Sequence, residues 1–206
     1  MTTAIHVNPF YTAVAVALLA AMLVMKANAI EEPSYTVERA WETEQIEIRR
    51  YAPRVMAITT MEGNDNDGFR VLAGYIFGGN AEEQKIAMTA PVQRTMSGKQ
   101  EMAFMMPSEY SLEDLPAPDD ERVGFEAAPA YIAAVIRFSG WASADKANDH
   151  WQRLRRFLIS EQIEIAGEPT LNQYNPPWTL PFLRRNEIIV PVALSEAAFS
   201  GSMGGR

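Results

Sequence analysis

The sequence predicts an α+β fold made of two successive units, each in the order strand, strand, helix, strand, strand. Short segments rich in β-branched and apolar residues flank two segments whose apolar residues have helical spacing. An Ala-Pro turn falls at residues 52–53 and again at 128–129, at the same place in each unit. This match suggests an internal duplication, in which two ββαββ halves form antiparallel sheets with two packed helices.

The elements of the first unit are predicted, in order, at residues 45–51, 55–61, 69–77, 85–93 and 100–106. In the first of these strands, Ile46 and Ile48 alternate with charged residues, as a half-buried strand requires. The helix is predicted to begin at Asn66 or Asp67, whose side chains favour the N-cap position. Gly78-Gly79-Asn80 is predicted to end the helix, because glycine is the usual residue just past a helix C-terminus.

The elements of the second unit are predicted, in order, at residues 123–127, 131–138, 143–162, 170–174 and 186–192. Its helix carries an apolar stripe from Ala147 to Leu158, with charged residues on the far face. Ser143 is its predicted N-cap.

The N-terminal segment differs from the rest of the chain. Residues 13–25 are an unbroken apolar run, and Ala27-Asn28-Ala29 follows with the small residues that signal peptidase needs. The run is shorter than the roughly 20 residues of a membrane span. We expect residues 1–29 to be a signal peptide, residues 30–194 to form one domain, and residues 195–206 to form a flexible tail. Because no Lys or Arg precedes the run, an uncleaved anchor in the inner membrane is the alternative.

Composition excludes several classes of function. The formal net charge is −8, which disfavours a nucleic acid partner because a phosphate backbone needs a basic face. The chain has no Cys, so disulfides, thiolate nucleophiles and Cys-based metal sites are excluded. After residue 29 the only histidine is His150, and a helix directs the side chain of its neighbour Asp149 elsewhere. Since nucleophile-elbow, metalloprotease and phosphate-loop motifs are also missing, the sequence predicts no enzyme.

Four ordered segments carry the strongest signal. They are Glu47-Ile48-Arg49-Arg50-Tyr51, the first helix with its Gly78-Gly79-Asn80 exit, Lys85-Ile86-Ala87-Met88-Thr89-Ala90-Pro91-Val92, and the closing stretch from Tyr174-Asn175-Pro176-Pro177 to Arg184-Arg185-Asn186-Glu187-Ile188. With these motifs, residues 32–192 resemble the SOUL haem-binding family. The resemblance implies two four-stranded antiparallel sheets and two helices in a distorted, pseudo-symmetric barrel. It also implies non-covalent binding of haem or a related tetrapyrrole in a shallow apolar groove that involves the first helix.

We therefore expect an exported carrier, buffer or scavenger of tetrapyrroles, periplasmic or secreted after cleavage of the signal peptide. Membrane contact is expected only through an uncleaved N-terminal segment. One alternative is a general small-molecule or effector-binding module without haem specificity. A third is an enzyme that acts on tetrapyrroles, for example by removing the metal. For that reaction the carboxylates nearest the expected groove are Glu82 and Glu83.

Haem is a flat apolar disc with two propionates, so its site needs aromatic or thioether side chains for the faces and Arg or Lys for the carboxylates. The residues of these types in or near the expected groove are Arg70, Tyr75, Phe77, Lys85, Met88, Arg184 and Arg185. The alternative interpretation places Tyr75 and Phe77 in the core and pairs Arg184 and Arg185 with Glu187 or with loops.

The axial ligand of the iron is a separate question. A histidine is the proposed ligand in some members of the family, but this chain has none in the first helix or in the strands around it. His150, on the second helix, is the candidate metal ligand, and the alternative interpretation gives it a structural role. Tyr75 or Met88 could also coordinate iron.

Overall fold

The computed structural model describes residues 30–61 and 65–194. The chain divides into residues 1–30 and residues 31–206, and every helix and strand described belongs to the second unit. The expected signal peptide and the expected tail lie outside the described residues, so both stay predictions, together with the domain limits. Within the described part of the chain, no helix combines the length and apolar character that a membrane span needs.

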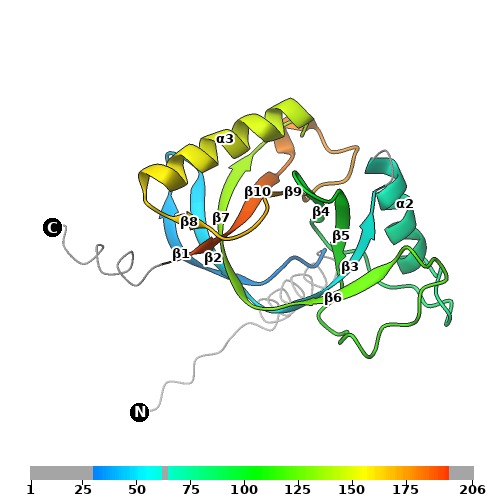
Figure 1. The fold of residues 1–206 in the computed structure, drawn as a ribbon. Coiled ribbons are helices and arrows are strands. Elements are labelled where there is room, and N and C mark those ends of the chain that lie inside the picture. Colours follow the sequence, from blue (N-terminus) through cyan, green and yellow to red (C-terminus); the bar gives the residue numbers. More distant parts are fainter. Residues whose placement is uncertain (1–29, 62–64, 195–206) are drawn as a thin grey trace, which may run out of the picture. The chain divides into compact units, whose positions relative to one another are not determined.

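Among the described residues, ten strands form one antiparallel sheet, which curls as Figure 1 shows. The strands are β1 (Tyr35–Trp41), β2 (Ile46–Tyr51), β3 (Arg54–Thr60), β4 (Val92–Thr95), β5 (Glu101–Met105), β6 (Gly124–Ala128), β7 (Tyr131–Phe138), β8 (Glu164–Ile165), β9 (Thr170–Gln173) and β10 (Asn186–Ala193). Two helices, α2 (Asp65–Ile76) and α3 (Ala144–Ser160), and a 3-10 turn, η1 (Pro181–Leu183), complete the described elements. The predicted α+β class is confirmed.

The order of the strands in the sheet is β1-β2-β7-β10-β9-β4-β5-β3-β6, with β8 paired to β10. Strands of the two sequence units are exchanged in this order, because β2 pairs with β7 and β3 pairs with β6. Consequently the two Ala-Pro turns lie side by side, with Tyr51 opposite Tyr131 and Arg54 opposite Ala128.

The same pairings bear on the expected duplication. The order from β2 to β6 reads the same from either end when β2, β3, β4 and β5 are exchanged with β6, β7, β9 and β10. Two separate four-stranded sheets are not confirmed, because β4 pairs with β9 and joins the two halves into one sheet. The duplication itself stays a prediction.

Most predicted elements fall where the sequence placed them, and the differences have local causes. The strand predicted at residues 85–93 is wrong for most of its length: only Val92 and Gln93 lie in β4, and the preceding residues make isolated bridges such as Phe77 to Lys85. Pro91 has no N–H to donate to a ladder at the start of that strand. Helix α2 includes Asp65, so the predicted N-caps are wrong. Strand β1 was not predicted from the sequence, because it is mostly exposed and pairs with β2 alone.

The helices cover the outer face of the curled sheet, α3 over β7 and β10 and α2 over β3 and β5 (Figure 1). Helix α3 buries Ala147, Leu154 and Leu158 against the sheet, and its predicted N-cap is confirmed, since the Ser143 hydroxyl accepts the Lys146 N–H at 3.3 Å. Side chains alternate along a strand. The strand residues that lie between those packed against the helices therefore face the inside of the curl. The inner face of the sheet is therefore the opposite of its helix-covered face.

Truncation of the α3 core is expected to destabilise the protein strongly. Leu154 is 0% exposed in the α3 cluster, and Ile159 on the same helix is 64% exposed. Leu154→Ala is expected to lower the free energy of unfolding by about 3 kcal/mol through lost burial and the cavity left behind. The matched control Ile159→Ala is expected to change it by less than about 0.5 kcal/mol. Urea denaturation followed by circular dichroism checks both, and equal losses would contradict the described packing of α3.

Candidate functional site

The outward face of α2 presents a cation, a bare helix surface and an aromatic ring. Arg70 is exposed, and its pairing with Asp67 lies on the helix surface. Gly74 follows one turn later, and a side chain built there would meet nothing within 4 Å. Phe77 comes next, 64% exposed although it is a large apolar residue. At 1.5 Å rise per residue, Arg70 and Phe77 lie about 10 Å apart along the helix direction.

Lys85 lies beside this strip, because its backbone pairs with that of Phe77 in an isolated antiparallel bridge. Its side chain is exposed. The structure therefore brings three of the residues predicted from the sequence together: Arg70, Phe77 and Lys85.

The exit of α2 explains why the chain turns back toward Lys85. Gly78 has φ +110°, a conformation that L side chains rarely adopt, and a side chain on Gly79 would approach the Gly74 carbonyl oxygen to 2.8 Å. The Asn80 amide donates to the carbonyl oxygens of Tyr75 (3.0 Å) and Gln84 (2.8 Å). The Gly-Gly-Asn motif is thus required by the turn.

Two other predicted residues of this region lie in the core. Tyr75 is buried against Leu72 and Phe104, and its hydroxyl donates to the Pro116 carbonyl oxygen at 3.0 Å. Burial raises the pKa of Tyr75 to about 12, so its hydroxyl stays protonated. Met88 is half-buried and packs against the same cluster. Ligand contact by either residue stays a prediction, and in this structure both fill the core beneath α2.

The two arginines before β10 already have partners. The Arg184 guanidinium donates to the carbonyl oxygens of Thr179 (2.9 Å) and Pro177, and it stacks 3.9 Å from the Trp141 ring centre. Arg185 binds Glu32 at 2.8 Å and lies over the Tyr174 ring at 3.5 Å. The alternative interpretation from the sequence, pairing with loops and with Glu187, describes what the structure shows for these two residues. A propionate contact by either stays a prediction.

The loop that holds Arg184 also exposes large apolar side chains, which the sequence analysis did not single out. They are Trp178, Leu180, Phe182 and Leu183. Trp141, in the loop that precedes α3, is exposed too. Trp178 is 84% exposed and Phe182 is 71% exposed. A hydrogen bond from the Gly140 N–H to the Pro181 carbonyl oxygen, 2.8 Å long, ties the two loops together.

His150 lies on the other helix. Its Nδ1 is 2.8 Å from the Lys146 carbonyl oxygen, and its ring stacks on Phe138 with centres 4.2 Å apart. Because α3 covers β7 and β10 whereas α2 covers β3 and β5, His150 belongs to the half of the sheet opposite the Arg70–Phe77 strip. The described residues contain no cluster of three or more His, Asp or Glu that could hold a metal ion, and Glu82 and Glu83 are exposed.

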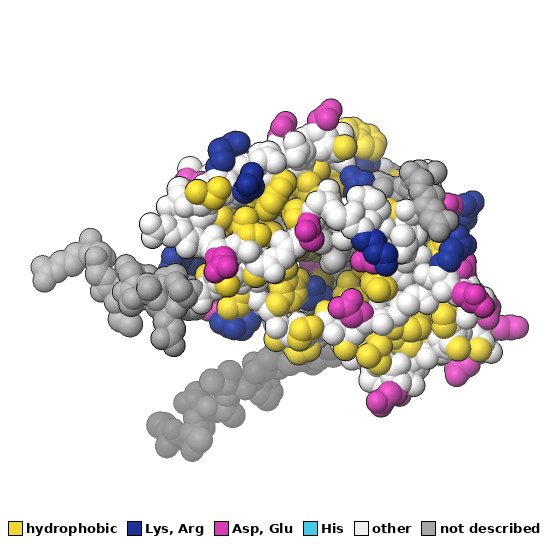
Figure 2. All heavy atoms as spheres, in the orientation of Figure 1, with side chains coloured by type: hydrophobic (Ala, Val, Ile, Leu, Met, Phe, Trp, Pro, Cys, Tyr) yellow, Lys and Arg dark blue, Asp and Glu magenta, His cyan; other side chains and the backbone are white. Residues whose placement is uncertain are grey.

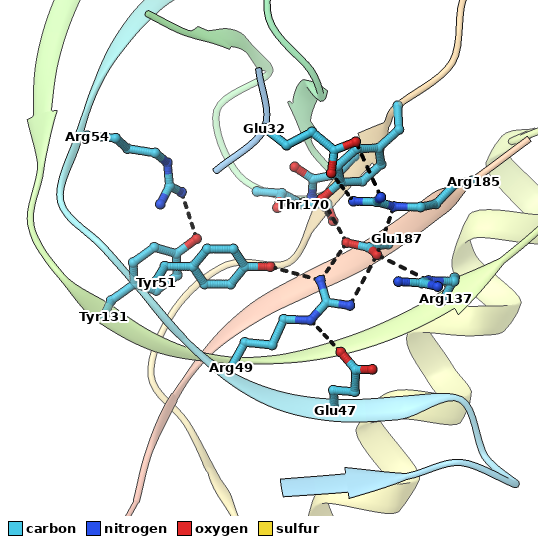
Figure 3. A network of polar contacts seen from close by, with 12 residues as sticks. Glu32, Glu47, Arg49, Tyr51, Arg54, Tyr131, Arg137, Thr170, Arg185 and Glu187 are labelled. Atoms are coloured by element: carbon cyan, nitrogen blue, oxygen red, sulfur yellow. Dashed lines mark hydrogen bonds and ion pairs between the residues drawn. The ribbon is translucent and has the colours of Figure 1, made fainter. Parts of the chain in front are cut away.

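The inner face of the sheet carries a buried polar network around Glu187, which is 0% exposed (Figure 3). Arg49 donates to both carboxylate oxygens, at 2.9 and 3.2 Å, and Tyr174 donates to Oε2 at 2.8 Å. Arg185 and Arg137 approach Oε1 to 3.3 and 3.4 Å. Two motifs recognised in the sequence, the one that contains Arg49 and the closing stretch, therefore meet at one carboxylate.

The partners of Glu187 decide its charge. Burial by itself raises the pKa of this carboxyl group, but the hydrogen bonds and charges of Arg49, together with the charge of Arg185 and the Tyr174 hydroxyl, outweigh that effect and lower it. Burial raises the pKa of Tyr174 well above its usual value, and the Glu187 charge adds to this. Glu187 is thus an ionised carboxylate whose role in this network is structural.

Two cavities lie beside Arg54, which the inner face also carries. The sheet-end cavity, of about 570 Å³, is lined by both Ala-Pro turns, by residues 31–34 and by residues 105–108. The inner cavity, of about 260 Å³, lies on the inner face and is lined by Met56, Gln93 and Thr170 among others. Arg54 lines both cavities, and Figure 2 shows the surface hollowed near the middle of the face in view. None of the site residues predicted from the sequence lines either cavity.

Comparison with known proteins shows which family this sequence matches. The sequence model of a family described as SOUL heme-binding protein matches residues 30–191. Heme-binding protein 2 of Homo sapiens is 31% identical over 179 residues, which cover 79% of this chain and 86% of the human protein. Heme-binding protein 2 of Mus musculus is 29% identical over 179 residues, covering 78% of this chain and 85% of the mouse protein.

Solved structures show the same fold at low identity. The C-terminal domain of EcmrR superposes with a TM-score of 0.57 at 10% identity, covering 72% of this chain and 97% of that domain. A protein described as a hydrolase from Listeria innocua superposes with a TM-score of 0.56 at 10% identity, covering 73% of this chain and 92% of its own. At such identities these likenesses concern the fold alone.

Loss of the Glu187 charge is expected to destabilise the protein at neutral pH. Glu187→Gln leaves the buried Arg49 with Glu47 as its remaining counter-charge, and the loss of the buried ion pair costs about 3 kcal/mol. Because the pKa of Glu187 is lowered in the folded state from its ordinary 4.5, its stabilisation is complete above that pH and is lost as the pH falls toward the folded-state pKa. Wild type and Glu187→Gln are therefore expected to converge in stability below pH 4.5.

Urea denaturation as a function of pH measures this difference. The control is Glu38→Gln, which breaks the surface pair with Arg50 and is expected to change stability by less than about 1 kcal/mol. A pH-independent gap between wild type and Glu187→Gln would contradict the assignment of an ionised, stabilising carboxylate.

Proposed function

Because the chain belongs to the SOUL heme-binding protein family, we propose that it binds haem or a related tetrapyrrole non-covalently, as a carrier, buffer or scavenger and not as an enzyme. The observation that carries the proposal is the family match over residues 30–191, which spans nearly the whole described chain. The two heme-binding relatives support it through their coverage of most of this sequence.

We place the ligand on the outward face of α2. A flat apolar disc gains most where it covers an exposed aromatic ring and meets no intervening side chain, and Phe77 and Gly74 provide these two conditions. Arg70 and Lys85 supply positive charges at the two ends of the strip for the propionates. The Arg70–Asp67 pair is exposed, so its exchange for a propionate costs little.

This placement leaves out Arg184 and Arg185, whose guanidinium groups are already bonded. It also separates the tetrapyrrole from His150, because α2 and α3 cover different halves of the sheet. An iron bond to His150 and a site on α2 are therefore alternatives, and the His150→Ala variant distinguishes them.

We further propose that the protein is exported, on the strength of the apolar run and the Ala-Asn-Ala site in its first 29 residues. Mass spectrometry of the protein from the envelope fraction is expected to find an N-terminus at Ile30. An intact Met1 would instead support an anchored N-terminal segment.

A hemin titration of the full chain, followed by Soret absorbance, tests the function and the site together. Wild type is expected to give a saturable shift at one equivalent. Phe77→Ala is expected to weaken hemin about tenfold, because an exposed ring that the ligand covers is lost. The double variant Arg70→Gln, Lys85→Gln is expected to weaken hemin as well, and to reduce the preference for hemin over its propionate dimethyl ester.

Phe182→Ala is the matched control, because Phe182 is equally exposed but lies on the loop before β10. It is expected to leave the titration unchanged, as is His150→Ala. A loss confined to Phe182→Ala would move the site to that loop, and a loss of the iron spectrum in His150→Ala would favour the histidine. No saturable shift, or equal binding of unrelated lipophiles, would replace haem binding with a general small-molecule module.

A further inference from the structure

Arg54 is a half-buried cation of the inner face, and two of its buried donor atoms lack partners. It stands at the start of β3 on the same face as Met56 and points into the curl of the sheet (Figure 3). Its Nη2 donates to the Tyr131 hydroxyl at 2.8 Å. Its Nε and Nη1 are buried and have no hydrogen-bond partner in the part of the chain that the structure describes. A buried donor left unpaired is costly, so such a group points to a missing acceptor.

The neighbouring arginines of the inner face each have a carboxylate beside them. Arg49 donates hydrogen bonds to Glu187, and Arg185 and Arg137 form ion pairs with it at 3.3 and 3.4 Å. Arg185 Nε also lacks a hydrogen-bond partner among the described residues, but its charge is neutralised by this ion pair. No described carboxylate forms an ion pair with Arg54, although glutamates line the cavities around it. Among the described residues of the inner face, Arg49, Arg137 and Arg185 converge on Glu187, whereas Arg54 has no carboxylate in an ion pair with it.

The two glutamates that line the sheet-end cavity, Glu31 and Glu32, are already engaged. Glu31 accepts the Ser108 N–H at 3.0 Å, and Glu32 binds Arg185 at 2.8 Å. The inner cavity is lined by Glu101, Glu126 and Glu168, so it disfavours an anion. An acceptor for Arg54 therefore fits from the sheet-end side.

The surroundings of Arg54 select the rest of the ligand. Its guanidinium carbon lies 5.0 Å from the ring centre of Tyr131 and 5.3 Å from that of Tyr51, and these two rings stack on each other. Pro33, Val55, Met105 and Pro129 are among the apolar walls of the sheet-end cavity. Its volume of about 570 Å³ lies within the range of small-molecule sites.

We propose that the sheet-end cavity is a second ligand site, for a small aromatic carboxylate whose carboxylate accepts the free N–H groups of Arg54. The aromatic part packs against the apolar walls of the cavity. This site is independent of the tetrapyrrole site on α2, and both can be occupied at once.

Binding of naphthoate to the full chain, measured by isothermal titration calorimetry, tests the proposal. Wild type is expected to bind naphthoate saturably at one equivalent and to bind the neutral naphthalene methanol more weakly. Arg54→Gln is expected to weaken naphthoate at least about tenfold, because charge-assisted hydrogen bonds to the carboxylate are lost. Arg50→Gln is the matched control: it removes the same charge from the preceding strand in the sequence, β2, where Arg50 pairs with Glu38 on the surface. It is expected to leave naphthoate binding unchanged.

A second variant tests the site in case Arg54→Gln does not fold. Ala127→Trp adds bulk at an exposed position that lines the cavity and leaves Arg54 in place, and it is expected to weaken naphthoate too. Equal affinity of wild type and Arg54→Gln, or equal affinity for the neutral analogue, would overturn the proposal. Displacement of naphthoate by inorganic phosphate at similar concentration would reduce the site to a general anion site, and displacement by hemin would overturn the independence of the two sites. Phe77→Ala is expected to leave naphthoate binding unchanged. The tetrapyrrole site on α2 and the naphthoate site in the sheet-end cavity can therefore each fail its own test independently of the other.

Discussion

The fold depends on one buried carboxylate. Glu187 is fully buried on the inner face, and a charge in that position is tolerated only because Arg49, Tyr174 and Arg185 satisfy it. These contacts join β2 to β10 and, through the pair of Arg185 with Glu32, tie the segment before β1 to the same point. Because one partner cannot be removed without leaving a buried charge, the network fixes which strands meet inside the curl.

This constraint changes what the sequence motifs mean. The Glu-Ile-Arg-Arg-Tyr segment supplies Arg49 and Tyr51, and the closing stretch supplies Tyr174, Arg185 and Glu187, so both motifs specify the Glu187 network. The Gly-Gly-Asn motif specifies the exit of α2, and Thr89 of the third motif donates to the Met105 carbonyl oxygen at 2.6 Å. Motifs that identify the family therefore describe how the chain folds. Of the residues proposed to touch ligands, Phe77 is exposed, and Arg54 has two donor atoms without a hydrogen-bond partner.

The same distinction separates what could be predicted from the sequence from what could not. Period-2 alternation and the Ala-Pro turns predicted strands β2, β3, β6 and β7, because these signals are local. They did not reveal that β2 pairs with β7 and β3 with β6. The helical stripe of α3 and its Ser143 cap are local too, and both were found. The contact of Arg49 with Glu187 joins residues 138 positions apart, and no local pattern encodes it. Arg54 was overlooked for a related reason: on sequence alone it is one charged residue after a turn, and its missing partners appear only when the inner face is assembled.

The symmetry of the sheet sharpens the case for Arg54. The residue after the first Ala-Pro turn is Arg54, and the residue after the second is Ala130. The two turns lie side by side and their strands pair in matching ways, so the backbone around them has the same requirements in both units. Since alanine meets those requirements in the second unit, the turn itself does not need an arginine. A half-buried cation that the backbone does not require, with two buried donors unpaired and no carboxylate in an ion pair with it, raises the free energy of the folded protein. Its presence is accounted for if a ligand supplies the missing charge, and the cavity beside it has the room and the apolar walls for one.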